Sequence, residues 1–156
     1  MMLDDRAEPM RTCEHTTCAA KRIKWLRGTR NLETHSGELK KLIATGTILE
    51  WSRHLDEREM QRQIPSRQST DAFENGECIW FGVVNDPIHG LTNKWLWLGY
   101  AKIGKATYRP LHLVITCNAK ESTRALTVAT VYDPSEKPWI WNDTFETKIC
   151  WEQNLL

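Results

Sequence analysis

Residues 111–117 read LHLVITC, and this stretch decides the class of fold that we expect. Leucine, isoleucine and cysteine at the odd-numbered positions alternate with His112, Val114 and Thr116 at the even-numbered ones. Because successive side chains of a strand point to opposite faces, this alternation predicts a β-strand with one face toward a core. The runs 78–84, 94–103 and 124–132 are also β-rich, and turn-forming segments separate them. The sequence therefore predicts four consecutive strands in its second half.

Helical patterns come before these strands. We expect helices over residues 19–26, from Ser36 to Gly46, over 52–62 and over 66–73. Helices followed by strands with short connections are typical of α+β folds. The expected fold is therefore α+β, with N-terminal helices packed on a roughly four-stranded antiparallel sheet. The aromatic segment after Pro134 is expected to pack back on that sheet.

The same patterns divide the chain into three parts. We expect a flexible N-terminal tail over 1–18, accessory helices over 19–45 and a main α+β domain over 46–152. No run is apolar enough to predict a membrane helix, and no secretion signal is found at the N-terminus. Five cysteines, an odd number with irregular spacing, argue against a disulfide framework and favour a reducing compartment. These features together favour a cytoplasmic protein with no membrane partner.

Composition excludes several functional classes. The 156 residues include 21 Lys+Arg and 20 Asp+Glu, a formal net charge of +1 that excludes a strongly basic nucleic-acid binder while allowing a local basic patch. Phosphate-cradling glycine loops, nucleophile elbows and zinc-protease motifs are all missing from the sequence. These absences argue against a nucleoside triphosphatase, a dinucleotide-binding enzyme, an α/β-hydrolase and a zinc protease.

The expected helix over 52–62 carries the first candidate site. His54, Arg58 and Arg62 recur at four-residue spacing, which places them on one slanted stripe. Imidazole titrates near neutral pH and suits general acid–base work, and guanidinium groups bind phosphate and stabilise charge that develops on it. This set suits cleavage of a phosphodiester by an internal 2′-hydroxyl. The other interpretation is a solvated helix in which the arginines pair with nearby carboxylates.

Two further groups could contribute to a site. His112, near Tyr108 and Arg109, could line a cleft, or it could be a hydrogen-bonded structural histidine of its strand. Aromatic residues could stack unpaired bases if exposed, although burial in a core is the commoner state. This aromatic set comprises Trp95, Trp97, Tyr100, Trp139 and Trp141.

Cysteine and histidine near the N-terminus raise the question of a metal. Cys13, His15 and Cys18 match zinc-ligand spacing only loosely, and no second cysteine pair follows them. His35 is a candidate fourth ligand. A flexible tail without metal is the interpretation that we prefer, and a zinc- or redox-responsive regulator is a weaker one.

Three blocks carry a resemblance to a known family. They are residues 48–62 with the following helix over 64–76, residues 104–115 with the strand RPLHLVI at 109–115, and residues 130–134 (TVYDP) followed by Trp141, Phe145 and Lys148. In order and spacing these blocks resemble the bacterial domain of unknown function family 4258, over about residues 46–150. That family is similar to small ribonuclease toxins of the RelE and BrnT type, in the superfamily that includes barnase and the colicin ribonucleases.

The resemblance implies a function. A metal-independent endoribonuclease acting as a bacterial toxin is expected, with RNA as substrate, no cofactor, and a cognate antitoxin or immunity protein as partner. It would act in the cytoplasm of its own cell or of a target cell. The catalytic residues implied are His54, Arg58, Arg62, His112 and Tyr132, and the RNA-binding residues expected are Arg53, Arg67, Arg109 and Lys148. The family usually ends in a pair of arginines, where this chain has Lys148 and Ile149. The alternative is a non-catalytic RNA- or protein-binding module of the same fold.

Overall fold

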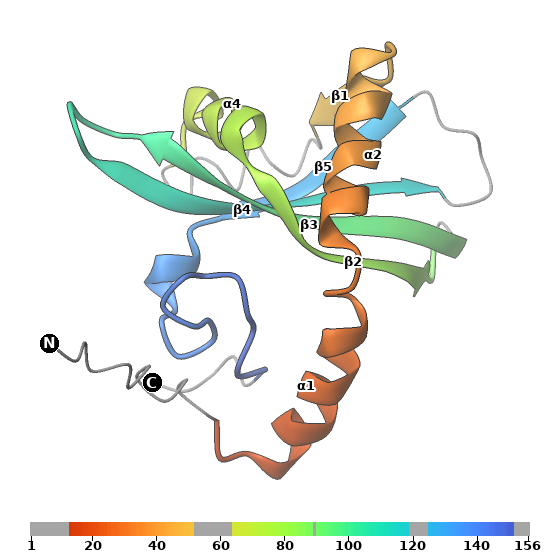
Figure 1. Cartoon of the computed structure of the whole chain (residues 1–156), viewed down its shortest axis with the longest axis vertical. Coiled ribbons are helices and arrows are strands. Elements are labelled where there is room, and N and C mark those ends of the chain that lie inside the picture. Colours follow the sequence, from red (N-terminus) through yellow and green to blue (C-terminus); the bar gives the residue numbers. More distant parts are fainter. Residues whose placement is uncertain (1–12, 52–63, 89, 119–124, 152–156) are drawn as a thin grey trace, which may run out of the picture.

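A computed structural model describes residues 13–51, 64–88, 90–118 and 125–151 (Figure 1). Its helices are α1 (Thr16–Arg27), α2 (Leu32–Ala44), α4 (Ser66–Asn75) and the short 3₁₀ helix η1 (Pro134–Glu136). Its strands are β1 (Ile48–Trp51), β2 (Glu77–Asp86), β3 (Gly90–Lys102), β4 (Tyr108–Asn118) and β5 (Ala125–Tyr132). They form one five-stranded sheet in the order β1-β5-β4-β3-β2. The expected α+β class is confirmed.

The strand count and the sheet type differ from the expectation. Strands β2 to β5 form the antiparallel meander that the sequence predicts, but β1 adds a fifth strand that runs parallel to β5. The sheet is therefore mixed rather than antiparallel. Within β1, Ile48 and Trp51 are exposed and only Leu49 packs against the core. Four residues with this burial give no alternation for a sequence pattern to detect.

One face of the sheet packs against α2 and α4. Strand β4 turns its odd-numbered residues to this face, as the sequence predicts, and Leu111, Leu113 and Ile115 are fully buried there. Trp95 and Trp97 of β3 are buried in the same cluster. Each buried aliphatic side chain contributes about 1.5–3 kcal/mol relative to exposure, so this cluster is the main core.

Helix α4 lies unusually close to β3. A Cβ atom added at Gly99 would overlap the backbone carbonyl of Ala72, so only glycine allows the approach. The side chain of Asn75 pairs with the backbone of Tyr100 through two hydrogen bonds, of 2.7 and 2.9 Å. The indole N–H of Trp97 donates to the carbonyl of Phe73 at 3.0 Å. These contacts fix the C-terminal half of α4 on the sheet.

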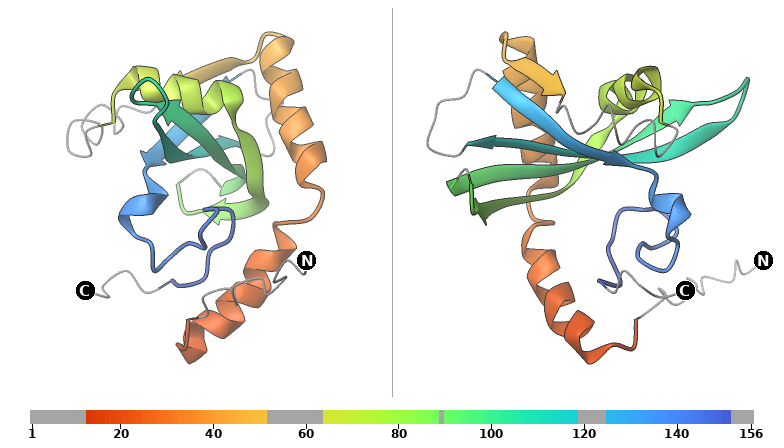
Figure 2. Two further views of the ribbon diagram at one scale, coloured as in Figure 1. Left: turned by 60° about the vertical axis from the view of Figure 1, so that its left-hand side comes forward. Right: turned by 180° about the vertical axis from the view of Figure 1, so that it is seen from behind.

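The opposite face of the sheet is covered by the segment after β5. Ile140 and Trp141 of this segment are buried against Ile79, Leu96 and Leu98 of the sheet. Figure 2 shows the segment and α1 on the same side of the sheet, across from α4. The expectation that the aromatic C-terminal segment packs back on the sheet is confirmed.

Residues 16–18, which the sequence analysis assigns to the N-terminal tail, belong to helix α1. Helix α1 begins at Thr16, and Cys18 is fully buried within it. The helix expected over 52–62 lies outside the described residues. Among the helices that the structure does describe, none has the length and apolar character needed to cross a membrane.

The close approach of α4 to β3 makes a direct prediction. Gly99→Ala is expected to lower the free energy of unfolding by about 1–3 kcal/mol, because the added methyl group meets rigid backbone. Chemical denaturation monitored by tryptophan fluorescence measures this loss. Gly37→Ala is the matched control, since nothing lies within 4 Å of a Cβ at Gly37 in α2. That change is expected to raise stability by up to about 1 kcal/mol, and equal effects of both changes would contradict the packing argument.

Candidate functional site

The predicted site residues are divided between described and undescribed parts of the chain. Arg53, His54, Arg58 and Arg62 lie in the segment 52–63, outside the described residues. The structure describes Arg67, Arg109, His112, Tyr132 and Lys148. Those five residues can therefore be compared with the roles expected for them.

His112 is enclosed between β4, β5 and the C-terminal segment. Its side chain is fully buried, its Nε2 lies 2.7 Å from the carbonyl of Phe145, and its Nδ1 lies 3.1 Å from the hydroxyl of Tyr132. A carbonyl only accepts, so Nε2 carries the proton and the Tyr132 hydroxyl donates to Nδ1. The ring also meets Trp141 edge to face, with centroids 4.4 Å apart. Both nitrogens are engaged within the fold.

Burial also determines the protonation of His112. Desolvation lowers the pKa of the imidazole to about 4, more than the carbonyl of Phe145 and the charge of Asp133 raise it. The ring is therefore neutral at physiological pH and out of reach of a substrate. A proton-transfer role for His112 is a poor fit to this geometry, and a structural role fits it well.

Arg109 is held by an internal ion-pair network. Its Nε lies 3.0 Å from the carboxylate of Asp133, and its terminal nitrogens lie 3.3 Å from Gln68 and 3.7 Å from Glu136. The other oxygen of Asp133 accepts from the backbone N–H of Ser135 at 2.8 Å. A guanidinium already shared among these groups ties β4 to α4 and η1, and it has less capacity left for phosphate. Arg67 is exposed on α4.

Besides its contact with His112, Tyr132 lies near a second predicted site residue, Lys148. Tyr132 and Lys148 line the same pocket, of about 270 Å³, at the end of β5. The pocket wall includes Tyr132, Asp133, Glu136, Lys137, Trp141 and Lys148. Its mixed charge and its size suit one phosphate or one small planar group.

Lys148 has an unusual environment for a lysine. Its ammonium lies 5.8 Å from the ring centroid of Trp141 and 5.4 Å from that of Trp151. Burial lowers the pKa of Lys148, and repulsion from Lys94 and Lys21 lowers it further. Within the described residues, no carboxylate forms an ion pair with Lys148. An anion would relieve this uncompensated positive charge.

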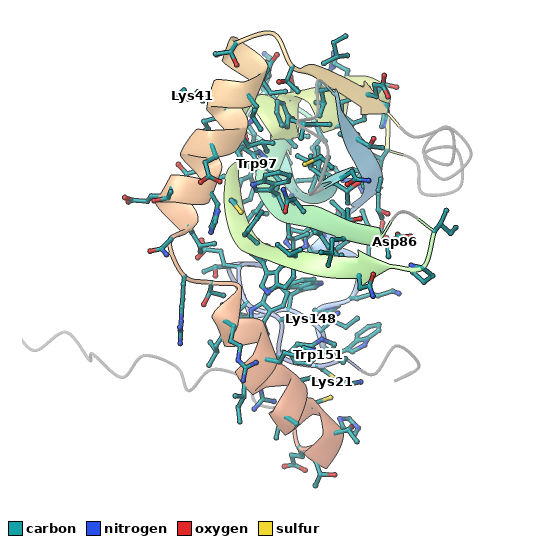
Figure 3. All side chains as sticks on the ribbon, turned by 90° about the vertical axis from the view of Figure 1, so that its right-hand side faces the viewer. Lys21, Lys41, Asp86, Trp97, Lys148 and Trp151 are labelled. Atoms are coloured by element: carbon teal, nitrogen blue, oxygen red, sulfur yellow. The ribbon has the colours of Figure 1, made fainter. Side chains whose placement is uncertain are left out.

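Lys148 belongs to a wider surface of lysines over tryptophans. Trp25 stacks on Trp80 with centroids 5.6 Å apart, and Trp25 also contacts Trp141 and Trp151 edge to face. The ammonium of Lys94 lies 5.8 Å from the Trp80 ring, and burial lowers the pKa of Lys94. Figure 3 shows Lys21, Lys148 and Trp151 close together beside α1. We name the group the basic–aromatic surface, made up of Lys21, Trp25, Trp80, Lys94, Lys148 and Trp151, with the buried Trp141 in contact with Trp25 and Lys148.

Sequence reasoning found only part of this surface. Trp95 and Trp97 are buried in the main core on the opposite face, and Tyr100 is exposed at the end of β3. Trp25, Trp80 and Trp151 come from three distant segments, and no local spacing links them. The useful signal was the high tryptophan count itself, because eight such residues exceed what one core of this size needs.

A cysteine–histidine cluster lies next to Lys148. Cys13, His15 and Cys18 come together with Cys150, and their ligand atoms all lie within 4.8 Å of one another. His35, which we considered as a fourth ligand, instead stacks on Phe81 with ring centroids 4.0 Å apart. The fourth group comes from the other end of the described chain. These four residues could hold a metal ion.

Comparisons with known proteins found no match: no family model fits the sequence, and no curated protein or solved structure is significantly similar to the chain. The family resemblance that the sequence blocks carry therefore stays a prediction.

The enclosed imidazole makes a pH prediction. The folded pKa of His112 is about 4, below the ordinary 6.5, so between these values the unfolded chain binds a proton that the native state does not. His112 therefore destabilises the fold as the pH falls from 6.5 to 4, by about 3 kcal/mol in full. Urea denaturation of wild type and His112→Gln at pH 7 and pH 4 measures the effect. The stability difference between the two is expected to shrink toward pH 4, and a difference that stays constant contradicts the assignment.

Proposed function

We propose that this protein binds single-stranded RNA on its basic–aromatic surface. The observation that carries the proposal is Lys148, a half-buried ammonium between two tryptophan rings, with Lys94 and Lys21 near enough to lower its pKa. A phosphate bound there would be attracted electrostatically by all three ammonium groups. Of the two rings that Lys148 contacts, Trp141 is buried, so the stacking surface for unpaired bases would come from the partly exposed Trp151 and from Trp25 next to it.

The distribution of charge favours RNA over a protein as the partner of this surface. The net charge of +1 gives no broad attraction to polyanions, so binding depends on this local surface. Cation–π contacts keep the lysines in place without neutralising them, unlike carboxylate partners. Base stacking contributes about 1–3 kcal/mol per base, and each phosphate contact adds a salt-dependent gain.

A second candidate function is cleavage of the bound RNA. The resemblance implies an endoribonuclease toxin neutralised by an antitoxin or immunity protein, and the His54, Arg58 and Arg62 spacing supports this chemistry. His54 would take the proton of a 2′-hydroxyl, and the arginines would hold the phosphate as a 2′,3′-cyclic phosphate forms and the 5′-oxygen leaves. Because His112 is enclosed and Tyr132 donates to it, His54 is the acid–base group on which this candidate depends.

RNA binding is tested at Lys148. Lys148→Gln keeps much of the side-chain stem but removes the charge, so we expect about tenfold weaker binding of a fluorescent single-stranded RNA. The slope of log affinity against log salt is expected to fall by about 0.7, the value for one phosphate contact. Fluorescence anisotropy over a salt series measures both quantities.

The control for this experiment is Lys41→Gln. Figure 3 shows Lys41 in the last turn of α2, far from Lys148, and the substitution changes charge equally. It is expected to leave affinity within about twofold. Lys148→Arg, which keeps the positive charge, is expected to restore binding. Equal losses in Lys148→Gln and Lys41→Gln, or no binding by wild type at low salt, would contradict the proposal.

Cleavage is tested at His54. Wild type incubated with labelled RNA, without added metal, is expected to give fragments ending in 2′,3′-cyclic phosphate, and His54→Ala is expected to lose at least about a hundredfold in rate. DNA of the same sequence is the substrate control, because it lacks the 2′-hydroxyl. Intact RNA with a wild-type protein that still binds it leaves the binding function standing and rejects cleavage.

A further inference from the structure

The cysteine–histidine cluster joins two distant parts of the chain. Cys13 and His15 precede α1, Cys18 lies in its first turn, and Cys150 comes from the C-terminal segment, 135 residues after His15. The Nδ1 atom of His15 lies 2.7 Å from the sulfur of Cys13 and 3.9 Å from that of Cys150. Four ligand atoms from separate elements thus converge on one point.

We propose that Cys13, His15, Cys18 and Cys150 bind one structural zinc ion. Three thiolates and one imidazole form a closed tetrahedral set of the kind that structural zinc sites use, with no position left for a water or substrate. Zinc–sulfur bonds of about 2.3 Å and zinc–nitrogen bonds of about 2.0 Å place tetrahedral ligands roughly 3.5–3.8 Å apart. Ligand atoms already within 4.8 Å of one another need only small side-chain adjustments to reach that geometry.

Two of the sulfurs already accept hydrogen bonds from the backbone. The backbone N–H of Trp151 donates to the sulfur of Cys18, and that of His15 donates to the sulfur of Cys13, each at 3.4 Å. Hydrogen bonds of this kind orient and stabilise metal-bound ligands. Cys18 also lies at the positive end of α1, and Lys148 is close enough to interact with Cys18 and Cys150. Zinc binding would release the three thiol protons and give the centre a net charge of −1. The positive charge of Lys148 would partly compensate that negative charge.

Packing gives a reason for a metal at this place. Among the residues that the structure describes, the hydrophobic cluster between α1 and the C-terminal segment has three buried members, Cys18, Ile149 and Cys150. Arg22 adds hydrogen bonds to the carbonyls of Cys13 and Ile149, at 3.3 and 3.1 Å. So small a cluster contributes little apolar burial, and metal ligation supplies folding energy where a core is too small. The zinc ion would fasten α1 to the segment that covers the sheet.

Metal content tests this proposal, which does not depend on RNA binding. The full chain purified under reducing conditions is expected to contain one zinc per chain by mass spectrometry of metals. Cys18→Ser is expected to lose it, and Cys117→Ser, which alters a thiol on β4 outside the cluster, is expected to keep it. Cobalt added to metal-free wild type is expected to give the visible and thiolate charge-transfer bands of a tetrahedral site.

A second pair of variants separates ligation from folding. His15→Cys preserves a four-ligand set and is expected to retain zinc, whereas His15→Ala is expected to lose it. A chelator is expected to lower the melting temperature of wild type and Cys117→Ser but not of Cys18→Ser. Three results overturn the proposal: a reduced wild type that neither contains nor binds zinc or cobalt, equal zinc in wild type and Cys18→Ser, or a disulfide within the cluster of the protein as isolated.

Discussion

The sheet is apolar on both faces at its centre, and the rest of the structure follows from the need to cover each of them. Strands β3 and β4 bury Trp97 and Leu113 on one face and Leu96 and Leu98 on the other. Leaving either face in water would forfeit about 25 cal/mol for each Å² of apolar area. Helices α2 and α4 cover the first face, and a largely irregular segment, held by tryptophans and hydrogen bonds, covers the second.

This constraint explains which parts of the fold could be predicted from sequence. The alternation in β4 and the turn residues between strands gave four of five strands and the α+β class. Strand β1 was not predicted from the sequence because its only core residue is Leu49, and because its partner β5 is far away in sequence. The covering role of the C-terminal segment could be expected from its aromatic residues, although its irregular backbone carries no periodicity that would predict its path.

The C-terminal segment that covers the second face also explains why His112 is enclosed. His112 lies on the polar-looking face of β4, where a sequence pattern suggests a solvent-facing catalytic group. The C-terminal segment covers His112, and the carbonyl of Phe145 accepts the hydrogen bond from the Nε2–H of the ring. Tyr132 and Lys148 meet in one pocket, as a shared role would require, but Cys150 could not be linked to Cys13 from sequence. Their proximity is a property of tertiary structure, since no local spacing encodes it.

The C-terminal segment therefore unites the features on which function depends. Within six residues, 145–150, it supplies the partner of His112, the half-buried charge of Lys148 and the third cysteine of the cluster. Lys148 lies against two indole rings, with Lys94 and Lys21 nearby. Its desolvation and the repulsion between the lysines destabilise the folded state by more than the local contacts stabilise it. A zinc–thiolate centre of charge −1 two residues away would offset part of this cost while leaving the outward side of the ammonium open to phosphate. The proposed metal site and the proposed RNA-binding surface would then be complementary parts of one electrostatic arrangement.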